Sequence, residues 1–424
     1  MNAKPDLLII NCKELLTMRG ASGKPKVGHE LDGPGIIHDG AVAICGDRII
    51  DVDVTGNLKH KYKDSSNCKI IDATGKIACP GFVDCHTHAV FGGSREREFV
   101  EKIKGASYLE ILKKGGGILN TVRDTRKLSI DELVNISMKY LDNMLTHGTT
   151  TVEIKSGYGL DLENELKLLK VIKVLNEKHP IDIVSTFLGA HAVPHEYKNH
   201  PGQYVDVVID MLPEVRHFAK YCDVFCDEGA FSVEQCRKIF VEAKKKGLKL
   251  KMHVNELKNI GGVGLSEELD IVSADHLDLT TDKEIDELVK SNVIGVLLPG
   301  VNFYLMNDNY APFMKMVEKD LPIALATDFN PGSCPTENMQ IIITIACLKM
   351  KMTPEQALCA STINGAHAIG AANEVGSIEA GKVADIVIFN VPSYDFIPYH
   401  FGVNNVEKVI KGGKLVVDNM KYNY

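Results

Sequence analysis

The sequence predicts an α/β protein built on a (β/α)8 TIM-type barrel, with a second, small β-sandwich domain assembled from both termini. Three observations lead to this prediction. Short apolar strands alternate with helices through the middle of the chain, eight such strands can be counted there, and short strands without intervening helices occupy both ends. At 424 residues, the chain is long enough for a barrel of about 250 residues and a smaller domain.

The two ends of the chain share one pattern of short apolar strands separated by turns. The predicted strands are residues 6–11, 41–45, 48–52, 69–72 and 76–78 at the N-terminal end, and residues 384–389, 406–410 and 414–417 at the C-terminal end. We therefore expect one β-domain formed by residues 1–78 together with residues 377–424, and a barrel formed by residues 79–376.

The middle of the chain contains the eight strands predicted for the barrel. They are residues 81–86, 150–155, 183–190, 223–227, 250–253, 271–276, 294–298 and 323–328. Several helices between them should begin with a capping box, a Ser or Thr followed three residues later by Glu or Gln, at Ser129, Ser232, Thr281 and Thr353. A doubly wound open sheet is the alternative, but no Gly-x-Gly-x-x-Gly follows a first strand.

Composition limits the partners and the compartment. A net charge of −8 and scattered basic residues argue against nucleic acid as a partner. No apolar run approaches the roughly 18 residues of a membrane-spanning helix, so we expect no membrane partner. The first residues lack the pattern of a secretory signal, and the eleven cysteines have no regular spacing, which is typical of reduced thiols. We expect a cytoplasmic protein.

Histidines and one aspartate lie where predicted barrel strands end, which is where the active sites of such barrels lie. His86 and His88 alternate on an extended segment, so both imidazoles point to one face. His253, His276 and Asp328 end three further strands. Any one of these residues could be a simple polar strand end, but five together indicate a metal site. Imidazoles with one carboxylate suit Zn²⁺ or iron better than Ca²⁺ or Mg²⁺.

Residues 80–88, Pro-Gly-Phe-Val-Asp-Cys-His-Thr-His, resemble the first-strand motif of the amidohydrolase superfamily, and the tail at residues 376–385 also matches it. Within that superfamily the chain resembles the imidazolonepropionase family. The matching segments are residues 90–96, 115–118, 153–159, 187–194 and 327–333. The resemblance covers nearly the whole chain. The segments around Arg95 and Tyr158 are more specific than the superfamily motif.

The resemblance implies an activity and a set of site residues. The activity is hydrolysis of the cyclic amide of 4-imidazolone-5-propanoate, a small anionic substrate, to N-formimidoyl-L-glutamate in histidine degradation. It further implies a homodimer and one Zn²⁺ or Fe ion per subunit. The implied metal ligands are His86, His88, His253 and Asp328. The residues implied to bind substrate are Arg95, Tyr158, His191, Glu256, Asn330, Gly332 and Ser333.

Three residues are candidates for proton transfer during hydrolysis. Glu256 lies three residues beyond His253 and could carry a proton to the substrate, although a plain carboxylate at a helix start is the alternative. His276 could orient or deprotonate the attacking water, and Asp328 could accept a proton as well as bind metal. The individual roles stay open.

Arg95 is the natural partner for the substrate carboxylate, because a guanidinium binds a carboxylate through two parallel hydrogen bonds. The alternative is a solvated surface arginine, since charged residues 96–98 follow it. Lys155 ends the second predicted strand, whereas the metal-bridging lysine of dinuclear superfamily members ends the fourth. We therefore expect a single-metal site, with Lys155 packing or hydrogen-bonding near the barrel mouth.

Two other functions remain open at this stage. A single-metal nucleobase deaminase would use the same histidines and aspartate but has less need for a carboxylate partner. A catalytically inactive scaffold would be expected to lack some ligands, and all of them are present here.

Overall fold

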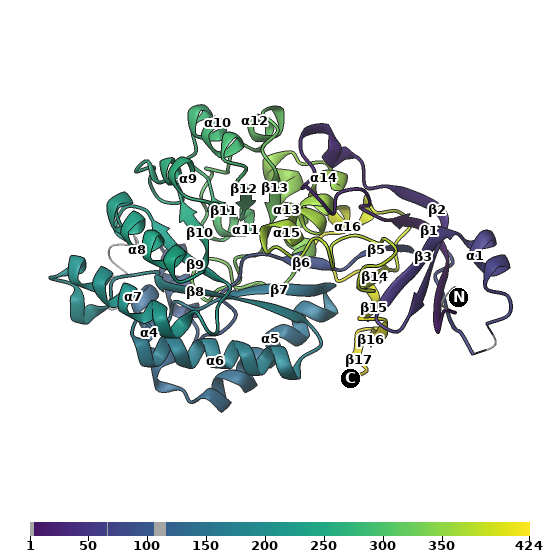
Figure 1. The fold of residues 1–424 in the computed structure, drawn as a ribbon, viewed down its shortest axis with the longest axis horizontal. Coiled ribbons are helices and arrows are strands. Elements are labelled where there is room, and N and C mark those ends of the chain that lie inside the picture. The colour runs from purple at the N-terminus through teal and green to yellow at the C-terminus, as the bar shows by residue number, and fades with distance from the viewer. Residues whose placement is uncertain (1–3, 66, 106–115) are drawn as a thin grey trace.

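The predicted barrel is confirmed by a computed structural model that describes residues 4–65, 67–105 and 116–424. Eight parallel strands pair in chain order, and helices surround them on the outside (Figure 1). The strands are β6 (Phe82–Asp84), β7 (Thr149–Lys155), β8 (Asp182–Ala190), β9 (Tyr221–Cys226), β10 (Lys249–Val254), β11 (Ile271–His276), β12 (Ile294–Leu297) and β13 (Ile323–Leu325). The doubly wound alternative is wrong. Residues 1–3, 66 and 106–115, which include the start of the family segment at Gly115, lie outside the described residues.

Contacts beyond β6 and β13 close the barrel. Both strands are shorter than predicted, because the chain after each leaves regular strand pairing. Thr87 forms a parallel bridge with Phe329, the amide of Asp328 donates to the carbonyl of His86 at 3.0 Å, and the amide of His88 donates to the carbonyl of Phe329 at 2.9 Å. The closure is therefore made by the same residues that carry the predicted metal ligands.

The helices begin largely where their capping residues predict. All four predicted capping boxes are confirmed: the side chain of each Ser or Thr accepts from the amide three residues later. The helices of the barrel region are α2 (Glu96–Ile103), α4 (Ile118–Lys127), α5 (Ile130–Thr146), α6 (Leu162–Lys178), α7 (Pro201–Val215), α8 (Val233–Lys245), α9 (Leu265–Glu268), α10 (Asp282–Lys290), α11 (Pro299–Tyr304), α12 (Phe313–Glu318), α13 (Met339–Met350), α14 (Pro354–Ala360) and α15 (Ile363–Ala368).

Strands from both termini form one mixed sheet, which confirms the second β-domain (Figure 1). It contains β1 (Leu7–Leu16), β2 (Ile36–Cys45), β3 (Arg48–Val54), β4 (Lys69–Asp72), β5 (Ile77–Pro80), β14 (Ile386–Phe389), β15 (Val406–Lys411), β16 (Lys414–Asp418) and β17 (Lys421–Tyr422). The two ends meet where β14 runs antiparallel to β5, with Ile386 opposite Pro80. A bulge near Asn11, whose φ is +59°, lets β1 pair with β4 on one half and with β5 on the other.

Gly81 connects the terminal sheet to the barrel. A Cβ atom at this position would lie 2.1 Å from the hydroxyl oxygen of Thr150, so only glycine allows β6 to pass so close to β7. The elements on either side of Gly81, β5 and β6, belong to different sheets, while the division of the chain at residues 78 and 376 stays a prediction. Within the described ranges, no helix combines the length and apolar character needed to cross a membrane.

Candidate active site

One cavity of about 370 Å³ opens at the carboxyl ends of the barrel strands and collects most of the predicted site residues. This volume lies within the range of pockets that bind small molecules. The predicted residues that line it are His88, Arg95, Tyr158, His191, His253, Glu256, His276, Asp328, Asn330, Gly332 and Ser333. Its remaining lining residues, which sequence reasoning did not find, are Lys102, Ile118, Phe225, Leu257, Leu305 and Met306.

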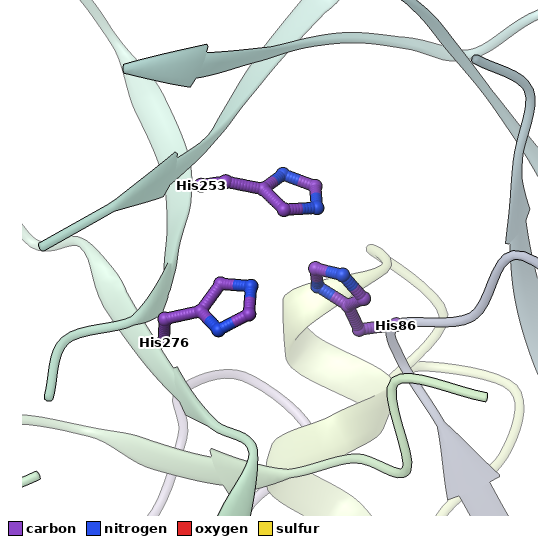
Figure 2. Close-up of side chains that lie close together, drawn as sticks. All are labelled: His86, His253 and His276. Carbon is purple, nitrogen blue, oxygen red and sulfur yellow. The ribbon is translucent and has the colours of Figure 1, made fainter. Parts of the chain in front are cut away.

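Imidazoles from β10, from β11 and from the segment after β6 converge at this end of the barrel (Figure 2). His86, His253 and His276 each offer one atom to a group whose members lie within 4.8 Å of one another, and His86, His88 and Asp328 form a second such group. Within the second group, Asp328 Oδ1 lies 3.4 Å from His86 Nε2 and 3.3 Å from His88 Nε2. The four predicted ligands are thus brought together around His86, which belongs to both groups.

Buried carboxylates fix the orientation of two of these imidazoles. Asp275 Oδ2 lies 2.6 Å from His86 Nδ1, and Asp223 Oδ1 lies 3.0 Å from His253 Nδ1. The opposite nitrogen, Nε2, is buried without a hydrogen-bond partner in both residues. Because a carboxylate accepts the Nδ1 proton, Nε2 has a free lone pair, as a metal ligand requires. The donor set therefore fits a metal ion.

Burial keeps the imidazoles neutral. Burial, reinforced by the nearby ammonium of Lys155, lowers the pKa of His86 and of His253 well below the usual value and lowers the pKa of His88 to about 3. Neutral imidazole is the form that coordinates a metal. Histidines that were protonated near pH 7 would repel a cation.

His276 and Glu256 face each other beside the predicted ligands His86, His88, His253 and Asp328, which we call the metal-ligand cluster. His276 Nε2 lies 3.5 Å from Glu256 Oε2. Burial raises the pKa of Glu256 well above its usual value, and the carboxylates of Asp328, Asp278 and Asp227 raise it further. Burial lowers the pKa of His276. Both shifts favour the neutral forms, a protonated Glu256 and an uncharged His276.

The backbone at Glu256 is fixed by a neighbouring carboxylate. Asp227, just beyond β9, accepts hydrogen bonds from the amides of Glu256, Leu257 and Lys258 at 2.8–2.9 Å. Glu256 does not begin a helix, so the alternative of a plain helix-start carboxylate is wrong; the first helical turn of this loop, η3 (Gly262–Gly264), begins later.

His276 and Asp328 both adopt left-handed backbone conformations, with φ of +79° and +52°. This region is disfavoured for residues with a Cβ and is concentrated at functional sites. Burial raises the pKa of Asp328 to about 7, against the opposing effect of His276. Its second oxygen, Oδ2, accepts from the side-chain amide nitrogen of Asn330 at 3.0 Å. The side-chain oxygen of Asn330 in turn accepts from the backbone amides of Gly332 and Ser333, so Asn330 shapes this loop.

Arg95 is not a solvated surface residue. Its Nε and Nη2 atoms lie 2.9 and 2.8 Å from Glu98 Oε2, and its side chain is only 11% exposed. The remaining nitrogen, Nη1, packs so closely against Gly332 that a Cβ there would lie 2.0 Å from it. Lys102, about two turns further along the chain in α2, donates to the carbonyl of Gly332 at 3.3 Å. Two cationic side chains therefore lie beside the Gly332 loop, and one of them, Arg95, is paired with Glu98.

Tyr158 and His191 line the cavity beside His88. The ring of His191 stacks on His88 with centroids 4.9 Å apart, and the ring of Tyr158 lies 5.3 Å from that of His191. The loop that carries Tyr158 is fixed by Glu165, a buried carboxylate that accepts from the amides of Gly157, Gly159 and Leu160 at 2.8–3.2 Å. Burial raises the pKa of the Tyr158 phenol, which therefore remains a hydrogen-bond donor.

Lys155 forms ion pairs inside the barrel. It is fully buried, and its ammonium lies 2.6 Å from Asp223, 3.2 Å from Glu153 and 3.3 Å from Asp275. These pairs confirm the expected hydrogen-bonding role. Charged residues such as Asp223 inside otherwise apolar strands are the sequence signal for this network, because such residues are rarely buried without partners.

Known proteins match this chain along almost its whole length. The chain matches the model of the Amidohydrolase family over residues 77–416. It is 50% identical over 416 residues to the imidazolonepropionase of Alkaliphilus metalliredigens (strain QYMF), covering 97% of this chain and 98% of that protein. It is 47% identical over 419 residues to the imidazolonepropionase of Geobacillus kaustophilus (strain HTA426), covering 98% and 99%.

Solved structures resemble the fold at low sequence identity. An adenosine deaminase from Xanthomonas campestris with bound zinc has a TM-score of 0.75 at 17% identity, covering 100% of this chain and 95% of that one. An ochratoxinase from A. niger has a TM-score of 0.69 at 17% identity, covering 98% and 96%. Likeness at this level of identity establishes the fold alone, whereas identity near 50% over full length establishes the family. The chain therefore belongs to the amidohydrolase family and, within it, to the imidazolonepropionases.

Proposed function

We propose that this enzyme hydrolyses 4-imidazolone-5-propanoate to N-formimidoyl-L-glutamate, using one metal ion bound by His86, His88, His253 and Asp328. The observation that carries the proposal is the combination within one cavity of a metal-ligand cluster and a buried arginine oriented by Glu98. The metal-ligand cluster suits hydrolysis of an amide, and the buried arginine suits recognition of a propionate.

The ligand set supports Zn²⁺ or iron, one ion per subunit. Three neutral imidazoles and one carboxylate are typical ligands of these ions. When bound, such an ion acidifies water and polarises a carbonyl oxygen. His276 lies in one group with His86 and His253. We assign it to the proposed chemistry, since its Nε2 atom faces Glu256 at 3.5 Å.

The charges at the two ends of the cavity orient the substrate. Arg95 and Lys102 are two cationic side chains that line the cavity beside Gly332, and they can bind a propionate carboxylate. The imidazolone ring would then face the metal-ligand cluster, in a cavity that Tyr158, Phe225 and Leu257 also line. Such a cavity suits a substrate that has an anionic tail at one end and a reactive ring at the other.

Hydrolysis adds water across the ring amide. The water oxygen bonds to the carbonyl carbon, the ring C–N bond breaks, and the released nitrogen takes one proton. Asp328 and His276 lie beside the ligand position, where either can accept the proton of the attacking water. The raised pKa of Glu256 favours its protonated form, which can donate to the departing nitrogen. We therefore assign Glu256 as the acid and leave the base to Asp328 or His276.

The direct test uses the purified wild-type enzyme with its metal content measured on the same sample. We expect stoichiometric conversion of 4-imidazolone-5-propanoate to N-formimidoyl-L-glutamate, with activity removed by a chelator and restored by Zn²⁺ or Fe²⁺. Absence of turnover in fully metal-loaded protein would overturn the proposal. Release of ammonia from adenine, guanine or cytosine would instead indicate the deaminase alternative, which only a low-identity fold likeness favours.

We also propose a cytoplasmic homodimer. All eleven cysteines are free thiols, which suits a reducing compartment. Large apolar side chains are exposed near the C-terminal end, with Leu348 74%, Tyr399 78% and Phe401 67% exposed, which supports a subunit contact there. Light scattering at micromolar concentration tests the dimer. A monomer mass that persists as concentration rises would contradict it.

A further inference from the structure

Five charged side chains fill the barrel interior beneath the metal-ligand cluster. They come from β7, β9, β10 and β11, and all are completely buried: Glu153, Lys155, Asp223, Lys251 and Asp275. Residues two apart on a strand point to the same side, so Lys251 and His253 of β10 both face inward. Each of these charges has an ion-pair partner, but even a well-paired buried ion pair adds little or no net stability compared with apolar side chains of similar size. Stability is therefore a weak explanation for this cluster.

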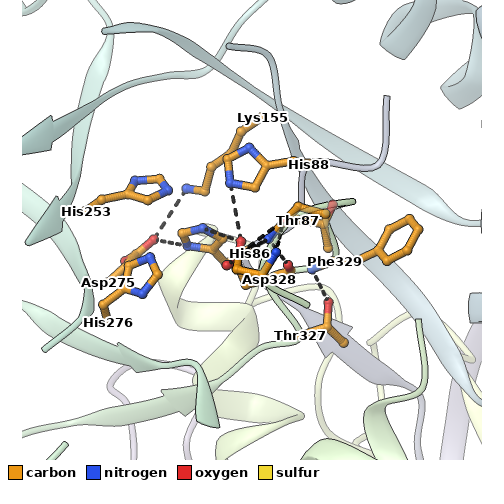
Figure 3. A network of polar contacts seen from close by, with 12 residues as sticks. His86, Thr87, His88, Lys155, His253, Asp275, His276, Thr327, Asp328 and Phe329 are labelled. Atoms are coloured by element: carbon orange, nitrogen blue, oxygen red, sulfur yellow. Dashed lines mark hydrogen bonds and ion pairs between the residues drawn. The ribbon is translucent and has the colours of Figure 1, made fainter. Parts of the chain in front are cut away.

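Lys155 is the connecting residue of this buried network. Its ammonium contacts the carboxylates of Asp223 on β9, Glu153 on β7 and Asp275 on β11. Figure 3 shows the ammonium of Lys155 directed at Asp275, beside His253 and His86. An ammonium has three N–H donors, so all of its hydrogen-bonding capacity is used by these carboxylates.

Two of those carboxylates are the partners of metal-ligand imidazoles. Asp223 contacts Lys155 through Oδ2 and His253 through Oδ1. Asp275 Oδ2 contacts both Lys155 and the Nδ1 atom of His86, and its Oδ1 atom accepts from Ser273 at 2.6 Å. One ammonium therefore links the supports of His86 and His253.

We propose that Lys155 is a positioning residue for the metal centre: by binding Asp223 and Asp275 together, it fixes the two imidazoles that point their Nε2 atoms at the shared ligand position. This inference rests on the proposed metal centre. The proposed role differs from that of a metal-bridging lysine, because the nitrogen of Lys155 is an ammonium surrounded by three carboxylates. Outer partners of metal-binding histidines commonly change metal affinity about 10–100-fold when they are replaced.

A purely electrostatic role for Lys155 predicts the opposite result. Removal of a buried positive charge next to a bound dication would strengthen metal binding, since like charges repel. A positioning role predicts weaker binding, because Asp223 and Asp275 would repel each other and release the imidazoles. The sign of the change in metal affinity therefore separates the two roles.

Lys251 provides a matched control in the same network. It is equally buried and equally charged, and it pairs with Glu153 and donates to the carbonyl of Cys85 at 3.2 Å. No contact joins its ammonium to Asp223 or Asp275 among the described hydrogen bonds and ion pairs. Lys251→Met therefore removes a buried cation of the same network while leaving the contacts of Lys155 with Asp223 and Asp275 in place.

The experiment compares Lys155→Met and Lys251→Met with the wild-type enzyme. After removal of metal, Zn²⁺ affinity is measured by competition with a chromophoric chelator, and the visible absorption of the Co²⁺-loaded proteins reports ligand geometry. Circular dichroism confirms that each variant is folded. We expect Lys155→Met to lose about 10–100-fold in Zn²⁺ affinity with an altered cobalt spectrum, and Lys251→Met to retain both.

Three results would overturn the inference. They are unchanged or tighter Zn²⁺ binding by Lys155→Met, an unchanged cobalt spectrum, or an equal loss of affinity in both lysine variants. Failure of the wild-type enzyme to bind Zn²⁺ or Co²⁺ at all would instead refute the proposed metal centre, which is a separate outcome.

A second pair of variants keeps the test decisive if Lys155→Met does not fold. Asp223→Asn and Asp275→Asn preserve side-chain size and remove the charge that Lys155 binds. We expect each to weaken Zn²⁺ binding and change the cobalt spectrum. Wild-type affinity and an unchanged spectrum in both would show that the histidines need no such support, and the inference would then fail.

Discussion

The Nε2 atom of His276 lies 3.5 Å from Oε2 of Glu256, and the surroundings shift the pKa of each residue toward its neutral form. A carboxylic acid beside a neutral imidazole forms a proton donor next to a proton acceptor. Burial raises the pKa of Glu256, and the nearby carboxylates of Asp328, Asp278 and Asp227 raise it further. This pair is the proposed proton-transfer part of the site.

Glu256→Gln should abolish proton donation while preserving shape. We expect kcat to fall about 10²–10⁴-fold, because general acid catalysis contributes about that much. KM and metal content should change little. Steady-state kinetics and metal analysis measure this. Glu228→Gln is the control, since Glu228 is 62% exposed and pairs only with Lys258 among the described ion pairs. A kcat near the wild-type value would show that another group supplies the proton.

His253→Ala should remove metal and activity together. His253 offers an unpartnered Nε2 atom, and its Nδ1 atom is already occupied by Asp223. Removal of one of four ligands leaves an incomplete shell. Elemental analysis of the purified variant should find substoichiometric metal, whereas the exposed His217→Ala control should retain a full complement. Full metal content in His253→Ala would contradict the ligand assignment.

Arg95→Ala should retain the metal but bind substrate weakly. A charge-assisted hydrogen bond contributes about 1.5–3 kcal/mol, which corresponds to a rise in KM of about 10–100-fold. The exposed neighbour Arg97→Ala is the matched control and should leave KM unchanged. Normal KM in Arg95→Ala would exclude its role as the carboxylate partner.

Lys102→Met tests the second cation of the cavity. Burial and the nearby charge of Arg95 lower the pKa of Lys102, an unfavourable arrangement that an anionic ligand would relieve. We expect KM for 4-imidazolone-5-propanoate to rise about tenfold, the effect of about 1.4 kcal/mol, with kcat nearly constant. Lys104→Met, on an exposed residue two positions away, is the control. Equal KM values in Lys102→Met and Lys104→Met would show that Lys102 has no part in binding the substrate.

The barrel strands and the meeting of the five candidate residues, His86, His88, His253, His276 and Asp328, could be predicted from the sequence because both follow simple rules. The choice of four metal ligands among them came from the family resemblance and stays a prediction. Apolar strands alternate with helices, and side chains two residues apart share a face, so His86 and His88 belong together at first reading. The other ligands follow once parallel strands are counted, since the carboxyl ends of a barrel meet at one rim. Topology alone therefore brings His253 and Asp328 to His86.

The rest depends on contacts between distant segments and on backbone conformation. The pairing of Arg95 with Glu98 depends on the direction in which α2 begins, and the left-handed backbone of His276 has no sequence signature. The network around Lys155 joins β7, β9 and β11 through side chains 68 and 120 residues apart. Charged residues inside apolar strands indicate that partners exist, but they do not identify which ones.

Gly332→Ala tests whether the close packing of Arg95 against Gly332 orients the guanidinium. A Cβ at Gly332 would lie 2.0 Å from Arg95 Nη1, far inside contact distance, so the guanidinium must move. Its Nε and Nη2 atoms are bound to Glu98, which limits how it can turn, and Nη1 would leave the position proposed for the propionate. We expect KM to rise about tenfold or more, with metal content unchanged, because small displacements of orienting groups reduce rates strongly. Gly264→Ala, where a Cβ meets nothing within 4 Å, is the control. If Gly332→Ala bound substrate normally, the close packing of Arg95 against this loop would have no part in recognition.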